Sequence, residues 1–269
     1  MIEPQAVDIA DPRLAAYRDL TDVQMRSAIE PREGFFMAEG LLVIERCVTA
    51  GLPVMSVLTA AKWLDRLSVV LGDFTGPVYV VDEEPLRELT GFRVHRGALA
   101  CVRRPDARRL DDIASLEGDL IVLGDLVDHT NVGLAMRSAA ALGLAGAVLS
   151  PACADPLYRR AIKASMGAVL TLPWARGHVW PDLLADLGDR TVLALTPDPS
   201  AADLADVLAS ADDRSIALVV GTEGPGLDPE AARMCDARAR IPMQGDVDSL
   251  NVAAAVAVAC YALRMRRQG

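Results

Sequence analysis

The order of apolar and polar residues predicts short helices and strands that alternate along the chain. In the first third, apolar residues recur at helical spacing, which predicts helices over 14–29, 39–50, 61–67 and 83–89. Short apolar or β-branched runs between them predict strands at 35–37, 54–58, 78–81 and 98–102. This part of the chain is therefore expected to form a small α/β unit.

The rest of the chain alternates more regularly. Mostly apolar runs predict strands at 120–123, 147–149, 168–172, 191–195, 216–220 and 239–241. Helices are expected between and after them, at 132–142, 157–165, 179–187, 204–208, 229–234 and 252–265. This alternation is typical of a parallel sheet covered by helices on both faces, in which ligands bind beyond the carboxyl ends of the strands. Chemistry is therefore expected in the loops that directly follow the strands.

A polar segment separates these two parts. Residues 103–109 show no hydrophobic periodicity and include Pro105, and Asp111 and Asp112 follow them. We therefore predict an N-terminal domain over 1–105, a linker over 106–118 and a second domain over 119–269.

Composition and charge narrow the class of protein. The chain has 269 residues and is 52% hydrophobic, which excludes a disordered protein. Its net charge of −10 counts mildly against a phosphate-rich partner, because lysine and arginine provide most affinity for nucleic acids. Arginines are nevertheless concentrated around the end of the first domain, at positions 87, 93, 96, 103, 104, 108 and 109, against only two carboxylates in that stretch.

The cysteines, the first residues and the longest apolar run indicate the cellular compartment of the protein. The five cysteines are single and widely spaced, which indicates reduced thiols and no metal site. The first residues lack a signal-peptide pattern, and the longest apolar run, 252–263, is shorter than the roughly 20 residues that span a bilayer. We therefore expect a cytoplasmic protein without a membrane segment or a bound metal.

The loop after the strand at 120–123 is unusually polar. It leads into a helix that carries Asn131, Gly133 and Arg137. Thr130 or Asn131 is expected to cap that helix. Gly133 and Arg137 are four residues apart and therefore share a helix face, where the glycine permits close approach of a backbone or ligand. A capped helix with an ordinary surface arginine explains the pattern equally well.

A glycine-rich loop, Gly-Thr-Glu-Gly-Pro-Gly-Leu, follows the strand at 216–220. Its spacing matches neither a P-loop nor a dinucleotide fingerprint, and Glu223 would repel a pyrophosphate. The loop suits a ligand with hydroxyl groups or a positive centre. A purely structural turn is the alternative.

A third loop, 241–251, leads into the last helix. Ser249 is expected to cap that helix, which leaves Asn251 inside its first turn, where asparagine is a poor helix former. The helix itself is apolar on all sides, so it should be buried or lie at an interface. Polar side chains at its start indicate a site.

Together these three loops resemble the motifs of the SpoU (TrmH-like) branch of the SPOUT RNA 2′-O-ribose methyltransferases. The matching runs are Asn-x-Gly followed by Arg137, Gly-Thr-Glu-Gly-x-Gly-Leu, and Ile-Pro-Met followed by Ser-Leu-Asn-Val, in that order within 119–265. The run 36–40 is similar, less specifically, to the substrate-binding domain of that family. A departure lies at His129-Thr130, where many members have a proline after the aspartate, and this leaves the subfamily open.

The resemblance implies a C-terminal domain with a deep trefoil knot and an N-terminal α/β domain that binds RNA. It implies S-adenosylmethionine as the cofactor, held by Leu195, Thr196, Gly221, Ile241 and Leu250. It places Arg137 at the catalytic centre, with Asn131, Glu223, Ser249 and Asn251 around it. Because a guanidinium holds its proton firmly at neutral pH, we favour Arg137 as a phosphate anchor over a general base.

The same resemblance implies an RNA partner and a homodimer. Ribosomal RNA is favoured over transfer RNA because of the N-terminal domain. The expected RNA-binding residues are Arg93, Arg96, Arg103, Arg104, Arg159 and Arg160, although the cations at 159–163 fit an ordinary solvated helix face equally well. The alternatives are a tRNA methyltransferase, a catalytically silent RNA-binding protein of the same fold, and an unrelated nucleotide-using α/β enzyme.

Overall fold

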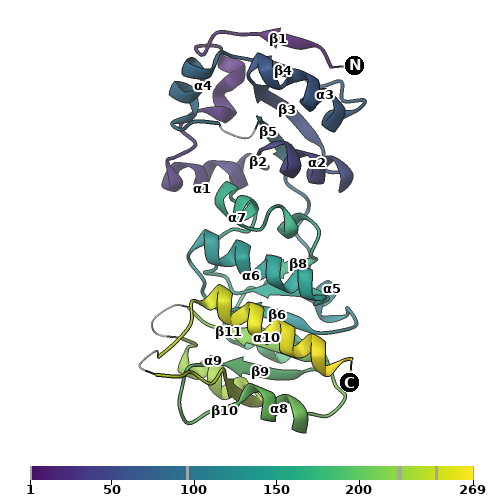
Figure 1. The fold of residues 1–269 in the computed structure, drawn as a ribbon, viewed down its shortest axis with the longest axis vertical. Helices are drawn as coiled ribbons and strands as arrows, with labels where there is room; N and C mark the ends of the chain where they lie inside the picture. The colour runs from purple at the N-terminus through teal and green to yellow at the C-terminus, as the bar shows by residue number, and fades with distance from the viewer. Residues whose placement is uncertain (1, 95–96, 223–225, 246–247, 269) are drawn as a thin grey trace. The chain divides into compact units, whose positions relative to one another are not determined.

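The computed structural model describes residues 2–94, 97–222, 226–245 and 248–268. The chain divides into two compact units (Figure 1). Unit 1 consists of Met1–Asp106 and Leu157–Leu170, and unit 2 of Ala107–Pro156 and Thr171–Gly269. Each unit is built around its own sheet.

Unit 1 contains a mixed five-stranded sheet in the order β1-β4-β3-β5-β2. Its strands are β1 (Pro4–Ala6), β2 (Phe35–Glu39), β3 (Val54–Thr59), β4 (Val78–Val80) and β5 (Ala98–Arg103). Strands β1, β4 and β3 pair in parallel, whereas β5 is antiparallel to both β3 and β2. The four strands expected from the apolar runs are confirmed, and β1 is an additional short edge strand.

The helices of unit 1 are α1 (Val23–Arg32), α2 (Leu41–Thr49), α3 (Leu64–Leu71), α4 (Glu83–Thr90) and α7 (Arg159–Ala164), with 3-10 helices η1 (Pro12–Tyr17), η2 (Ala61–Trp63) and η3 (Ala168–Leu170). The single helix predicted over 14–29 is wrong, because the chain turns between η1 and α1. Asp19 has a positive φ of 49°, and the Asp22 side chain caps a new helix by accepting from the Met25 amide. Leu14 and Tyr17 of η1 are fully buried in the core.

Unit 2 contains a seven-stranded sheet in the order β10-β12-β9-β11-β6-β7-β8, in which neighbouring strands pair in parallel. Its strands are β6 (Leu120–Leu123), β7 (Gly146–Leu149), β8 (Trp174–Arg176), β9 (Thr191–Leu195), β10 (Ala202–Asp203), β11 (Ile216–Val220) and β12 (Ala237–Arg240). The central strands β6, β7 and β11 are buried at every position. The predicted parallel α/β fold is therefore confirmed for this unit.

The helices of unit 2 are α5 (Leu110–Ala114), α6 (His129–Leu142), α8 (Leu204–Ser210), α9 (Pro229–Met234) and α10 (Val252–Arg266), with the 3-10 helix η4 (Asp182–Asp186). The strand predicted at 168–172 is wrong, because that run contains η3 and the sheet edge is formed by β8 instead. The segment expected as a linker contains α5. Its Ile113 is fully buried in the core of unit 2, so part of this segment belongs to that unit.

The segment 157–170 departs from the domain boundaries expected from the sequence, because it packs with unit 1 rather than unit 2. The buried Glu39 carboxylate on β2 receives hydrogen bonds from two cations of α7, Arg159 and Lys163. The Arg159 guanidinium also lies over the Phe92 ring, 4.3 Å from its centroid. These contacts join residues 67 to 124 positions apart, which is why local sequence pattern did not reveal them.

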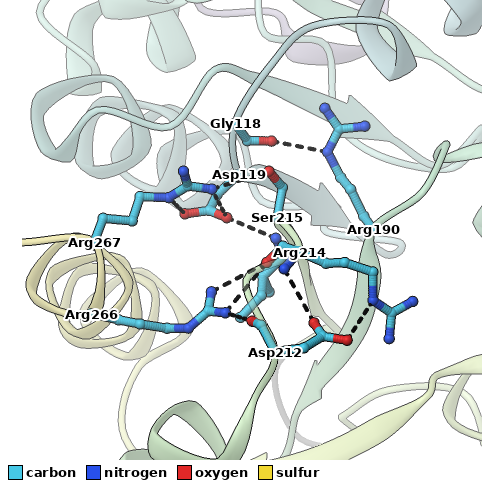
Figure 2. A network of polar contacts seen from close by, with 9 residues as sticks. Gly118, Asp119, Arg190, Asp212, Arg214, Ser215, Arg266 and Arg267 are labelled. Carbon is cyan, nitrogen blue, oxygen red and sulfur yellow. Dashed lines mark hydrogen bonds and ion pairs between the residues drawn. The ribbon is translucent and has the colours of Figure 1, made fainter.

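A polar network holds the end of α10 at the amino-terminal edge of the unit 2 sheet (Figure 2). The Asp119 carboxylate, 4% exposed, accepts hydrogen bonds from Arg267 Nε at 2.6 Å and Nη2 at 2.7 Å. It also accepts one from the Ile216 amide at 2.7 Å. The network therefore joins the start of β6, the start of β11 and the end of α10.

None of the helices described in the structure combines the length and hydropathy that crossing a lipid bilayer requires.

Candidate functional site

A cavity of about 280 Å³ lies in unit 2 where three neighbouring parallel strands end. Strands β9, β11 and β12 end at Leu195, Val220 and Arg240, and α10 begins at Val252. The described residues that line the cavity come from these ends: Leu195, Thr196, Pro197, Val220, Gly221, Thr222, Gly226, Ile241, Met243, Ser249, Leu250, Asn251, Val252 and Ala255. The structure thus brings together all five residues expected to bind the cofactor, although their sequence positions span 195–250.

The glycine-rich loop closes tightly against itself at Gly221. A Cβ at this position would lie 2.3 Å from the Gly226 oxygen and 2.4 Å from the Leu227 nitrogen, which are backbone atoms that cannot rotate away. Gly226 itself has a positive φ of 75°, which favours glycine. The two glycines therefore set the shape of this wall of the cavity. Glu223, predicted as a catalytic residue, lies outside the described residues.

The loop after β9 is shaped by its own polar groups. The Thr196 hydroxyl accepts a hydrogen bond from the Asp198 amide at 3.2 Å, and Asp198 Oδ1 accepts one from the Ser200 amide at 2.9 Å. The hydrogen bond from Ser200 holds the pKa of Asp198 below its usual value, and the nearby Arg238 charge adds to this. Thr196 therefore lines the cavity and also helps to form the turn.

The first and third motifs meet through two asparagines. Asn251 Nδ2 donates a hydrogen bond to Asn131 Oδ1 at 3.2 Å, which joins the start of α10 to the first turn of α6. Asn251 Oδ1 accepts from the Ala253 amide at 3.0 Å and so caps α10. The cap predicted at Ser249 is therefore wrong, because Asn251, directly before α10, provides the cap. Ser249 is exposed and lines the cavity.

The cap of α6 also differs from expectation. Asp128, rather than Thr130 or Asn131, accepts a hydrogen bond from the Asn131 amide at 2.8 Å. Because its backbone is held in this way, the Asn131 side chain is available to Asn251. Gly133 is buried, as close packing at this position requires.

Arg137 is exposed and is not among the described residues that line the cavity. Within the part of the chain that the structure describes, its guanidinium forms no hydrogen bond or ion pair. An exposed arginine without an internal partner can bind an anionic group from outside the molecule.

The arginines expected to bind RNA have different environments. Arg93 and Arg103 of unit 1, and Arg160 on α7, are exposed, and Arg96 lies outside the described residues. Arg104 is half-buried, and its Nε donates to the Phe35 carbonyl at 2.9 Å.

Arg159 requires a correction, because its side chain is buried against Glu39 and Phe92 instead of facing solvent. The arginine-rich stretch is also divided between the units, since Arg108 and Arg109 belong to unit 2.

Sequence reasoning did not identify every residue of the cavity. Thr222, Met243, Val252 and Ala255 also line it. Each of these residues lies within or beside one of the three motifs. Their position next to a motif is the only feature of the sequence that points to a place in the cavity. Among the described residues, no group of three or more His, Cys, Asp or Glu side chains is arranged to hold a metal ion.

Comparison with known proteins gives this arrangement a family. The model of the SpoU rRNA Methylase family matches residues 119–261, more than half of the chain. An "uncharacterized tRNA/rRNA methyltransferase" of Mycobacterium bovis is 37% identical over 256 residues, which cover 94% of this chain and 89% of the relative.

Two solved structures extend the likeness to the whole fold. A structure described as an AdoMet-bound rRNA methyltransferase from Sinorhizobium meliloti is 25% identical and superposes with a TM-score of 0.81, covering 97% of this chain and 98% of that one. A structure described as an RNA 2′-O ribose methyltransferase is also 25% identical, with a TM-score of 0.78 and full coverage of both chains. The second and third motifs line one cavity, the first is joined to them through the Asn131–Asn251 hydrogen bond, and the family match spans all three, so the chain belongs to the SpoU rRNA methylase family.

Proposed function

We propose that this protein is an S-adenosylmethionine-dependent RNA methyltransferase that methylates a ribose 2′-hydroxyl, with ribosomal RNA favoured over transfer RNA. The observation that carries the proposal is the single cavity formed by the second and third motifs, joined to the first motif through the Asn131–Asn251 hydrogen bond. The AdoMet-bound relative and the 2′-O ribose methyltransferase relative support the choice of cofactor and reaction.

The residues of the cavity fit the proposed cofactor. An adenine ring needs an apolar slot with backbone hydrogen-bonding groups near it, and Leu195, Ile241 and Leu250 provide apolar walls at strand ends. The cavity is close in size to the lower end of the usual range for small-molecule sites, about 300 Å³. When bound, S-adenosylmethionine would supply a methyl group on a positively charged sulfur. The proposed cofactor residues are Leu195, Thr196, Gly221, Ile241 and Leu250.

Of the proposed catalytic residues, Ser249 and Asn251 line this cavity, and Asn131 contacts Asn251. We assign Asn131, Ser249 and Asn251, together with Glu223, to the surroundings of the target 2′-hydroxyl, which must be oriented before it can react. Arg137 is assigned to the RNA phosphate next to that hydroxyl, because its guanidinium is exposed and has no described partner. Exposed Arg93, Arg103 and Arg160 are assigned to more distant RNA contacts.

A homodimer is part of the proposal. The apolar side chains Val258, Tyr261 and Met265 of α10 are 44%, 56% and 46% exposed and recur at helical spacing. Helix α6, which carries Arg137, packs beside α10 (Figure 1). A second copy would cover this stripe. The deep trefoil knot belongs to the same proposal. It is supported by the path of the chain after β12, because α10 packs against α6, the helix that follows β6, and strands β9 and β11 lie between β12 and β6 in the sheet.

The test is transfer of tritiated methyl groups from S-adenosylmethionine to separated ribosomal and transfer RNA fractions from cells lacking the gene. Incorporation at alkali-resistant ribose positions in ribosomal RNA is the expected result. Incorporation only into transfer RNA would support the tRNA alternative, and base methylation would refute 2′-O transfer. Calorimetric titration with S-adenosylmethionine, NAD and ATP distinguishes the proposal from an unrelated nucleotide-using enzyme.

Arg137 can be tested separately. Arg137→Ala should abolish methyl transfer while cofactor affinity changes only a few-fold, because Arg137 does not line the cavity. Arg233→Ala, an exposed arginine on α9, is the matched control and should retain activity. Loss of cofactor binding in Arg137→Ala would instead indicate a structural role.

A further inference from the structure

Unit 1 has a groove of its own at one edge of its sheet, where two parallel strands end. Strands β3 and β4 are parallel, and their last residues pair with each other, since Thr59 is opposite Val80. Thr59 is also opposite Ala98, the first residue of β5, so the start of β5 lies at the same edge. In parallel sheets, ligands bind beyond this edge.

A small polar cavity of about 70 Å³ lies at this edge. Its lining includes Lys62 and Trp63, which follow β3, Glu83, which follows β4, and Arg93 and Gly97, which precede β5. Gly97 is fixed in place, because its carbonyl accepts a hydrogen bond from the buried Thr59 hydroxyl at 2.7 Å. Its φ of 106° and the contact that a Cβ would make with Leu41 both require glycine.

The half-buried Trp63 indole is surrounded by cations. Lys62 Nζ lies 5.7 Å from the centroid of the ring, and the Arg66 guanidinium carbon lies 5.5 Å from it. Arg93 adds a third positive charge at the same cavity. One carboxylate opposes them, since Glu83 forms an ion pair with Lys62. The pKa of Glu83 is lowered mainly by its hydrogen bond from Lys62, and Arg93 contributes to the same effect.

We propose that Trp63 is a stacking platform for an unpaired nucleobase of the substrate RNA, with Lys62, Arg66 and Arg93 binding the adjoining phosphates. A partly exposed aromatic ring flanked by cations is the combination that binds single-stranded nucleic acid, because every base offers a π-face and every linkage a charge. Trp63 is one of three tryptophans in the chain and is half-buried, so part of its ring is open to a ligand. The inference rests on the proposed function, because that function makes RNA the ligand. It adds a site in unit 1 that would select the RNA.

The experiment measures binding of a fluorescein-labelled ten-nucleotide single-stranded oligoadenylate RNA to the full-length protein by anisotropy. Trp63→Ala should weaken binding by about 5- to 150-fold, the loss expected for one stacked base. Trp63→Phe should recover most of the affinity, because a phenyl ring still offers a face for stacking, and an unchanged urea unfolding curve for Trp63→Ala checks that this variant is folded. Arg66→Glu should weaken binding and reduce its dependence on salt.

The matched controls are exposed residues of unit 1 outside the groove. Val69→Ala tests removal of an exposed apolar side chain on the same helix as Arg66, and Arg32→Glu tests charge reversal at an arginine that is 72% exposed. Both should bind the RNA as the unmodified protein does. In addition, RNA should quench the tryptophan fluorescence of the unmodified protein, and this quenching should be largely lost in Trp63→Phe although that variant still binds.

Several results would overturn the inference: no binding of the single strand, equal affinity in Trp63→Ala, or equally tight binding of a duplex of the same length that is insensitive to Trp63. Methyl transfer to ribosomal RNA, assayed in parallel, separates this site from the proposed function. Transfer with an unchanged KM for RNA in Trp63→Ala would leave the enzyme assignment intact and refute the stacking site. Trp63-dependent binding without any methyl transfer would support the stacking site and contradict the proposed function.

Discussion

Removal of the Asp119 carboxylate should cost unit 2 a large part of its stability. In Asp119→Ala, the buried Ile216 amide loses its acceptor, which costs about 1–3 kcal/mol. Arg267 loses its bidentate partner, but its side chain is 45% exposed and can be hydrated, so this adds only about 1 kcal/mol. The expected loss is therefore about 2–4 kcal/mol in the free energy of unfolding.

Urea unfolding followed by tryptophan fluorescence measures this loss, because Trp174 and Trp180 both belong to unit 2. Asp189→Ala is the matched control, since this aspartate is 93% exposed and lies 3.8 Å from Arg214, and its effect should stay within about 0.5 kcal/mol. Arg267→Ala leaves the buried Asp119 carboxylate without its charged partner and should also be destabilising, whereas Arg264→Ala, an exposed arginine of the same helix, should cost almost nothing. A loss below 1 kcal/mol in Asp119→Ala, or an equal loss in Asp189→Ala, would refute the reasoning.

Three further predictions concern the site, the unit 1 packing and the thiols. Gly221→Ala should weaken S-adenosylmethionine binding by more than tenfold in calorimetry, because its Cβ collides with backbone; Gly226→Ala, which has open space around it, should have the smaller effect, and the opposite order would contradict this account. Glu39→Ala leaves buried Arg159 without its carboxylate and should cost about 3–5 kcal/mol, seen as lost hydrogen-exchange protection over 157–170, whereas exposed Glu45→Ala should not. Burial raises the pKa of four thiols to about 12, those of Cys47, Cys101, Cys235 and Cys260. They should react with Ellman's reagent at pH 8 only after unfolding, and rapid labelling of the native protein would contradict this. Their contribution to stability should be complete below about pH 8.5, the pKa of a thiol in the unfolded chain, and decline as the pH rises toward 12.

The central elements were predictable because their signals are local. The runs at 120–123 and 216–220 are apolar at every position, and 191–195 is apolar after Thr191. A strand covered on both faces accommodates such runs, and all three are strands with those bounds. The incorrect predictions concern segments whose secondary structure depends on neighbouring elements in the fold. The apolar run at 168–172 contains a 3-10 helix, while the edge strand β8 at Trp174–Arg176 exists because β7 offers it hydrogen bonds.

The sequence by itself determined the family and the kinds of residue in the site, because each motif is a short run whose chemistry depends on the residues present. The tertiary structure decided which of those residues come together. It placed Leu195, Gly221 and Leu250 around one cavity, and it made Asn251 a helix cap bonded to Asn131. It also decided which cations are available, since Arg159 is neutralised by Glu39 while Arg137 remains exposed. An arginine has the same local signature in both settings, and only the distant partner that folding brings to it sets its role.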